Sequence, residues 1–109
     1  MNEAIEYLPP WKATGQFADN LVKELEREVT EGHKLWRVKV KAIAQRIDSD
    51  DVLFKIEEGI NGYAVVHLTW SGEPEKDTKW PDTRIFGSLE AWITECMKVD
   101  HAEFVGMNE

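Results

Sequence analysis

The stretch YAVVHLTW, residues 63–70, constrains the fold more than any other, because it is apolar on both faces of an extended chain. Successive side chains of a strand point to opposite sides of the sheet. One side of this stretch would carry Ala64, Val66, Leu68 and Trp70, and the other would carry Tyr63, Val65, His67 and Thr69. Such a composition is typical of a central strand, or of a strand whose second face is covered. Residues 63–70 are therefore predicted to form a central or covered strand.

Two preceding segments carry the signals of further strands. Residues 34–48 alternate with a period of two, which predicts a half-buried antiparallel strand with a basic outer face. Its apolar positions are Trp36, Val38, Val40, Ala42 and Ala44, and its polar positions are Arg37, Lys39, Lys41 and Gln45. Residues 51–59 follow a turn rich in Asp and Ser and are predicted to form the next strand. Asn61-Gly62 then has the composition of a hairpin turn.

Two segments with helical periodicity flank these strands. Apolar residues recur every three or four positions over residues 15–30 and again between Ser88 and Asp100, which predicts two amphipathic helices. Ser88 is a suitable N-cap for the second helix. The order of elements predicts an α+β fold: an N-terminal helix, a three-stranded antiparallel meander and a C-terminal helix, with both helices packed on one sheet face. At 109 residues the chain is expected to form a single domain, residues 1–109.

Composition excludes several classes of function. The 21 acidic and 13 basic residues give a formal charge of −8, which repels phosphate backbones and anionic lipids, so no nucleic-acid or membrane partner is expected. The same charge favours a basic partner, although a purely solubilising role explains it as well. The single cysteine offers no disulfide framework. With neither about 20 consecutive apolar residues nor a basic and then apolar N-terminus, the chain is expected to be cytoplasmic.

The sequence offers no set of residues with the spacing of a catalytic or metal site. Cys96 lies on the apolar face of the second predicted helix, so a core position is favoured over a nucleophilic role. The three histidines lack the spacing of a zinc site. The aspartates at residues 48–51 lack the glycine and the distal glutamate of a calcium loop. We expect no catalytic residue, metal or cofactor, and an enzymatic activity stays open as an alternative.

Five tryptophans are the unusual feature of the sequence. Trp36, Trp70 and Trp92 fall on predicted core faces. Trp11 and Trp80 lie in proline-containing segments, where a tryptophan either packs back on the core or stays exposed as an interface anchor. Packing back is the favoured interpretation for both, with Trp80 fastening the charged loop that follows the last predicted strand.

Residues 48–104 resemble a family of small bacterial proteins. The resemblance rests on a VHLTW strand at residues 66–70, a WP-containing loop at residues 80–81 and a closing DHAEF segment at residues 100–104. It covers more than half of the chain, whereas the N-terminal helix is similar only in character. The resemblance implies a soluble bacterial protein and assigns no activity and no functional residue.

The favoured hypothesis is a non-enzymatic acidic binding protein, of the immunity or inhibitor type, for a basic protein such as a bacterial toxin. Small size, the charge of −8 and tryptophans in loops suggest it, because charge complementarity speeds encounter and fixes orientation. The residues expected to contact the partner are Trp80, Glu73, Glu75 and Asp77, followed by Asp50 and Asp51.

Two other hypotheses belong to different classes of protein. One is a small-molecule-binding module, or a minor enzyme, with a pocket between the sheet and the helices. That pocket would be lined by Tyr63, His67, Thr69 and Trp92. The other is a homo-oligomeric structural domain, in which Arg37, Lys39 and Lys41 meet an acidic surface of a second copy.

Overall fold

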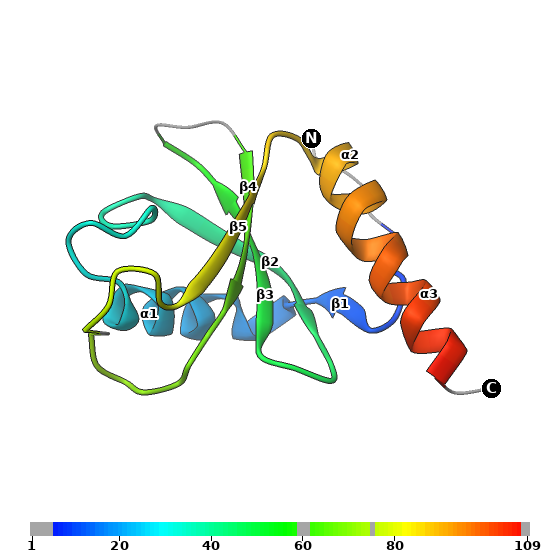
Figure 1. The fold of residues 1–109 in the computed structure, drawn as a ribbon, viewed down its shortest axis with the longest axis horizontal. Helices are drawn as coiled ribbons and strands as arrows, with labels where there is room; N and C mark the ends of the chain where they lie inside the picture. The colour runs from blue at the N-terminus through cyan, green and yellow to red at the C-terminus, as the bar shows by residue number, and fades with distance from the viewer. Residues whose placement is uncertain (1–5, 59–61, 75, 108–109) are drawn as a thin grey trace.

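The computed structural model describes residues 6–58, 62–74 and 76–107 (Figure 1). Its centre is a five-stranded antiparallel sheet whose strands follow one another in sequence order. The strands are β1 (Trp11–Ala13), β2 (Val40–Arg46), β3 (Asp51–Ile56), β4 (Gly62–His67) and β5 (Asp82–Phe86). The predicted α+β class is confirmed. The predicted three-stranded meander is wrong, because β1 and β5 add one strand at each edge. Asn61 of the predicted hairpin turn lies outside the described residues.

Both edge strands are short and lie in segments without a clear strand pattern. β1 has three residues and aligns with β2, so that Trp11 lies opposite Arg46. β5 follows the charged stretch and aligns with β4, so that Asp82 lies opposite His67. Pairing with a stronger neighbouring strand, more than local propensity, therefore determines the extended conformation of both.

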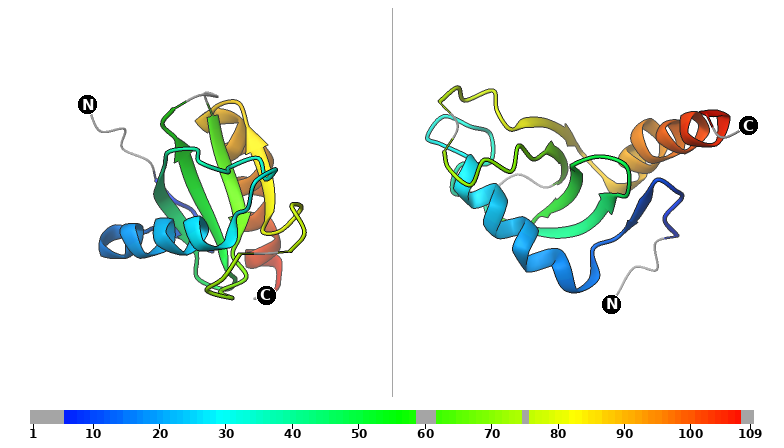
Figure 2. Two further views of the ribbon diagram at one scale, coloured as in Figure 1. Left: turned by 90° about the vertical axis from the view of Figure 1, so that its left-hand side faces the viewer. Right: turned by 90° about the horizontal axis from the view of Figure 1, so that it is seen from below.

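The helices cover opposite faces of the sheet (Figure 2). The first is α1 (Ala18–Glu28), which follows a 3-10 turn, η1 (Gly15–Phe17). The second is one continuous helix made of α2 (Leu89–Trp92), a π-helical turn, η2 (Ile93–Met97), and α3 (Lys98–Met107). The prediction that both helices pack on one sheet face is wrong.

The central strands are apolar on both sides, and this property explains the two-sided packing. In β3, Phe54 belongs to the core beside α1, whereas Leu53 packs with Trp92 of the C-terminal helix. In β4, Val66 belongs to the core beside α1, and Val65 belongs to the core beside the C-terminal helix. A single layer of helices would leave one of these apolar faces in water.

A bulge in β2 interrupts the predicted alternation. Ala42 lies opposite Phe54 but Ala44 lies opposite Leu53, so β2 holds one extra residue at this point. Ala42 therefore belongs to the core beside α1, and Ala44 belongs to the core beside the C-terminal helix. The predicted single apolar face from Trp36 to Ala44 is wrong for this reason, and also because the chain forms turns before β2.

Polar contacts cap the C-terminal helix at its start and join it to the sheet farther along. The predicted N-cap is confirmed, since Ser88 Oγ accepts a hydrogen bond from the Ala91 N–H. Farther along, the Asp100 carboxylate accepts a 2.9 Å hydrogen bond from the Trp11 indole and lies 3.4 Å from the Arg46 guanidinium. The two Asp100 contacts join the helix to β1 and β2.

Candidate functional site

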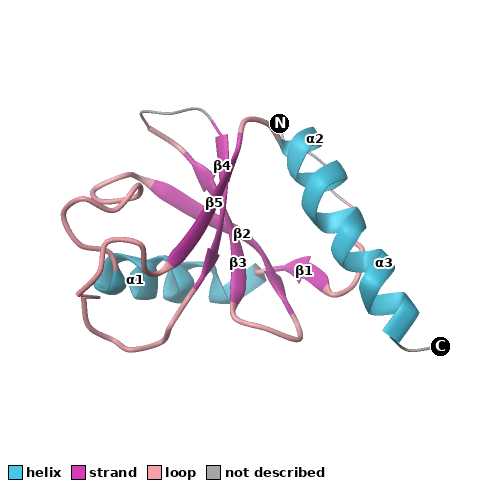
Figure 3. Cartoon of the chain, in the orientation of Figure 1, coloured by secondary structure: helices cyan, strands magenta, loops and turns pink. Residues whose placement is uncertain are grey.

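The β4–β5 loop, residues 68–81, is a long connection that runs beside α1 (Figure 3). It holds the charged stretch between Trp70 and Trp80. Both indoles stay partly in water, with 50% of Trp70 and 42% of Trp80 exposed. The prediction that Trp70 lies on a core face is therefore wrong, and so is the prediction that Trp80 packs back on the core.

The other three tryptophans divide between core and surface. Trp92 and Trp11 are buried, as predicted. Trp36 is 37% exposed, so its predicted core position is wrong. It lies outside β2 and contacts the guanidinium of Arg37 at 5.4 Å from the ring centroid. Arg37 has a left-handed backbone, with φ of 58°, which breaks the extended geometry just before the strand.

The basic stripe predicted for a homo-oligomer is also altered by this break. Arg37 lies in a turn, while Lys39 and Lys41 are exposed. Lys41 lies opposite Lys55 of β3, so like charges are neighbours there. Assembly through this surface stays a prediction.

Two buried glutamates of α1 hold the start of the loop. Glu28 is fully buried and accepts hydrogen bonds from the N–H groups of Thr69 and Trp70, both at 2.8 Å. Glu24, one turn earlier, is also buried and accepts a hydrogen bond from the Gly72 N–H at 3.2 Å. We call Glu24 and Glu28 the carboxylate clamp. The clamp supplies acceptors for three backbone donors of a segment that lies outside the sheet.

One carboxyl of the clamp has an unusual proton affinity. Burial, followed by the hydrogen bond with Glu24, raises the pKa of Glu28 to about 7, although the Thr69 and Trp70 N–H groups act in the opposite direction. The pKa of Glu24 is lowered, chiefly by its hydrogen bond with Glu28. Of the two carboxyls, Glu28 therefore has the raised pKa and Glu24 the lowered one.

The raised pKa of Glu28 predicts how stability depends on pH. The folded protein keeps the Glu28 proton up to about pH 7, whereas the unfolded chain releases it near the ordinary carboxyl pKa of 4.5. The stabilisation from this group is therefore complete below 4.5 and is lost as the pH rises through 7. Glu28→Gln, which does not titrate, is expected to flatten this fall. Urea unfolding at about pH 5 and about pH 8 measures the effect, and an equal fall in both proteins would contradict it.

The clamp also holds Trp70 in a strained backbone conformation. Its φ is +57°, in a region that bulky residues rarely adopt. Strain of this kind amounts to about 1–3 kcal/mol and persists only where the surroundings impose it. The left-handed turn takes the indole away from the core face that Leu68 occupies, which explains why the alternation of residues 63–70 fails at its last position.

Trp70→Gly is expected to leave the free energy of unfolding within about 1 kcal/mol of the wild type, because glycine adopts this φ without strain and offsets the lost apolar contacts. Trp70→Ala loses the same indole but keeps a Cβ, so it is expected to be the less stable of the two. Urea unfolding of both variants measures the difference. An alanine variant that is more stable than the glycine variant would argue against strain at residue 70.

A buried histidine holds the end of the loop. His33 Nε2 donates a 2.9 Å hydrogen bond to the Pro81 carbonyl, and His33 Nδ1 accepts one of 3.0 Å from the Leu35 N–H. Pro81 is itself buried. Close by, the Lys34 ammonium donates a hydrogen bond to the Thr83 carbonyl at 3.2 Å. The loop is thus fixed at both ends by residues other than its tryptophans.

Three of the predicted contact residues, Trp80, Glu73 and Asp77, lie exposed between the two fixed ends of the loop. Glu75, predicted with them, lies outside the described residues. Asp77 orders the local turn: its carboxylate accepts from the Lys79 N–H and its carbonyl accepts from the Trp80 N–H, both at 3.0 Å. The Lys79 ammonium also lies 3.6 Å from this carboxylate, an exposed pair that offsets part of the loop's negative charge.

The other two predicted contact residues lie beside the start of the loop. The Asp50 carbonyl accepts a hydrogen bond from the Leu68 N–H at 3.1 Å, which joins the β2–β3 turn to the end of β4. The Asp50 side chain is exposed. Asp51 is less available to a partner, because its carboxylate lies 2.8 Å from Nδ1 of His67.

The residues of the predicted pocket near His67 divide between two places: Tyr63 packs against the buried cluster that holds Trp92, whereas His67 and Thr69 lie at and just beyond the far end of β4. Trp92 is a fully buried residue of the C-terminal helix. His67 is exposed and hydrogen-bonded to Asp51. Tyr63, at the other end of β4, lines a shallow hollow beside the start of α2. The Thr69 N–H is bound by the carboxylate clamp.

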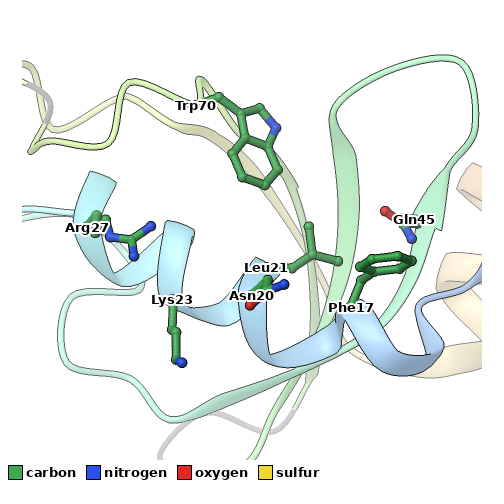
Figure 4. Close-up of a pocket in the computed structure, with 7 residues that line it drawn as sticks. All are labelled: Phe17, Asn20, Leu21, Lys23, Arg27, Gln45 and Trp70. Atoms are coloured by element: carbon green, nitrogen blue, oxygen red, sulfur yellow. The ribbon is translucent and has the colours of Figure 1, made fainter.

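A groove that the sequence did not predict lies between the loop and α1 (Figure 4). Its volume is about 400 Å³. Trp70 and Phe17 stand on either side of Leu21, which lies on the buried face of α1. The polar side chains that complete the lining are Asn20, Lys23 and Arg27 of α1 and Gln45 of β2.

The cysteine has a structural role. Cys96 is buried, as predicted, and burial together with the nearby Asp100 raises the pKa of its thiol to about 12, which keeps the thiol protonated. Among the described residues, no three His, Cys, Asp or Glu side chains form a group that could hold a metal ion. In the same part of the chain, no helix has the length and apolar character needed to span a bilayer.

Comparison of the chain with family models, with curated proteins and with solved structures gives no match. The resemblance of residues 48–104 to a bacterial family therefore stays a prediction. Function can be inferred only from the residues and their arrangement.

Proposed function

We propose that this is a non-enzymatic binding protein that recognises a basic protein through the β4–β5 loop. The exposure of Trp80 carries the proposal. The carboxylate clamp, His33 and Pro81 fix the two ends of the loop, so the 42% exposed indole is not what holds the loop in place. Tryptophan is one of the residue types enriched among interface anchors, and Trp80 is exposed on the loop.

Exposed carboxylates on the segment of Trp80, together with the net charge of the protein, support a basic partner. Glu73 and Asp77 lie exposed on the same segment, and the protein as a whole carries −8. Carboxylates near an indole can bind a Lys or Arg side chain by ion pairing combined with a cation–π contact. Inhibition of a basic toxin, as an immunity protein performs it, is the form of this function that we favour.

The proposal is tested by using the tagged protein to capture partners from a lysate of the source organism at low salt, with bound proteins identified by mass spectrometry. The expected result is a basic protein that is released as salt rises, because ions screen exposed charge pairs. Retention of no protein, or of a protein that salt does not release, would contradict the proposal.

A double variant tests whether the loop itself makes the contact. Glu73→Lys with Asp77→Lys is expected to weaken affinity for the captured protein by about tenfold or more. The matched control is Glu95→Lys with Glu103→Lys, which changes the net charge equally on the exposed side of the C-terminal helix. The control is expected to retain most of the affinity. An equal loss in both double variants would show an effect of net charge alone.

A further inference from the structure

We propose a second ligand site in the groove between Trp70 and Phe17, and we infer that it takes a small organic anion with a flat apolar body, such as an aromatic carboxylate or sulfonate. This inference goes beyond the proposed function. It uses other residues than the surface around Trp80, and its ligand has the opposite charge.

The apolar part of the groove suits a ring. Trp70 and Phe17 are 50% and 51% exposed, and both line the groove. Large aromatic side chains are usually more buried than this. Leu21 closes the space between them (Figure 4). A flat apolar ligand would remove both aromatic surfaces from water. The volume of about 400 Å³ falls in the range of small-molecule sites, about 300–1,000 Å³.

The polar part of the groove is opposite in sign to the protein as a whole. Among the described residues, those that line it include two cations and two amides but no carboxylate. Arg27 is paired with Glu24 of the clamp at 3.2 Å. No ion pair within the described ranges occupies Lys23, which is exposed. Figure 4 shows its ammonium pointing away from Trp70, so a rotation of this flexible side chain brings the charge to a ligand in the groove. Asn20 and Gln45 add amide donors that can bind the same acidic group.

Both aromatic walls are in place before any ligand arrives. The two hydrogen bonds to Glu28 fix the backbone of Trp70. On the other side, the Phe17 N–H donates to the Thr14 carbonyl at 3.2 Å, and Thr14 is buried and donates its hydroxyl to the Ala42 carbonyl. A preformed site loses little conformational freedom on binding.

The proposal is tested by fluorescence titration with two probes. One is the aromatic anion 1-anilinonaphthalene-8-sulfonate, and the other is its uncharged relative N-phenyl-1-naphthylamine. The wild type is expected to bind the sulfonate saturably at one site and about fivefold more tightly than the uncharged probe, as one available cation predicts. Added salt is expected to weaken the binding of the sulfonate and to leave the binding of the uncharged probe unchanged. Equal affinity for both probes, or no saturable binding, would overturn the proposal.

Two variants locate the binding at the groove. Trp70→Gly removes one wall and relieves the backbone strain at that residue, so the protein is expected to stay folded while the Kd of the sulfonate rises about tenfold or more. Lys23→Gln is expected to raise that Kd about fivefold and to leave the uncharged probe unaffected. Trp36→Ala and Lys39→Gln, beside a different hollow, serve as matched controls and are expected to bind like the wild type. Unchanged affinity in Trp70→Gly would show that the sulfonate binds elsewhere.

Discussion

Glu28→Ala is expected to lower the free energy of unfolding by about 2–4 kcal/mol. Glu28 is fully buried and accepts 2.8 Å hydrogen bonds from the N–H groups of Thr69 and Trp70. Alanine leaves both donors without their acceptor and opens space beneath the loop. Each unsatisfied donor that stays buried costs about 1–3 kcal/mol, and water that enters from the loop side would recover part of that.

The loss is expected to be local as well as global. In Glu28→Ala, the amide hydrogens of Thr69 and Trp70 should exchange with solvent much faster than in the wild type. Glu26→Ala, on the exposed side of the same helix, is the matched control and should change stability by no more than about 0.5 kcal/mol. If the two variants were equally stable, the clamp would not be what fixes the loop.

Trp92→Ala is expected to lower the free energy of unfolding by about 3–5 kcal/mol. Trp92 is fully buried, with its ring centroid 5.2 Å from that of Trp11 and 6.2 Å from that of Tyr7, both in edge-on contact. It joins the C-terminal helix to the second face of the sheet. Alanine leaves a cavity at this contact, because two packed layers cannot collapse fully into it.

Trp92→Phe is expected to cost much less, about 1–2 kcal/mol. The Trp92 Nε1 is buried and has no hydrogen-bond partner in the described part of the chain. Phenylalanine therefore removes an unsatisfied donor and keeps most of the ring volume. Urea unfolding of the wild type and both variants, followed by circular dichroism, measures the two losses. A phenylalanine variant as unstable as the alanine variant would contradict the packing described here.

Elements with a strong local period could be predicted from the sequence. The helix up to Glu28, β2 and the buried position of Trp92 follow from periodicity, which a single segment shows by itself. β3 was predicted from the turn residues before it, and β4 from its apolar residues on both faces. The edge strands do not, because β1 and β5 depend on their neighbours for pairing. The face that each helix covers was also misjudged, although the two apolar faces of residues 63–70 already indicated a second layer.

The candidate site depended on contacts between distant segments, which periodicity does not report. Glu24 and Glu28 follow Leu21 and Leu25 at spacings of three, so an acid on the core face of α1 was a visible signal of a buried carboxyl. Its partners could not be read in the same way, since the Thr69 N–H lies 41 residues beyond Glu28. For the same reason, the sequence predicted Trp70 as the end of a core face when the clamp turns it outward.

The measurement that tests the central claim most directly is the affinity of Trp80→Ala for the captured basic protein, determined together with its free energy of unfolding. An interface anchor predicts a Kd about thirtyfold higher than that of the wild type, which corresponds to about 2 kcal/mol. Stability should stay within about 1 kcal/mol of the wild type, and Trp36→Ala, another exposed tryptophan, should bind normally. Unchanged affinity with a large loss of stability would contradict the account and assign Trp80 to the core.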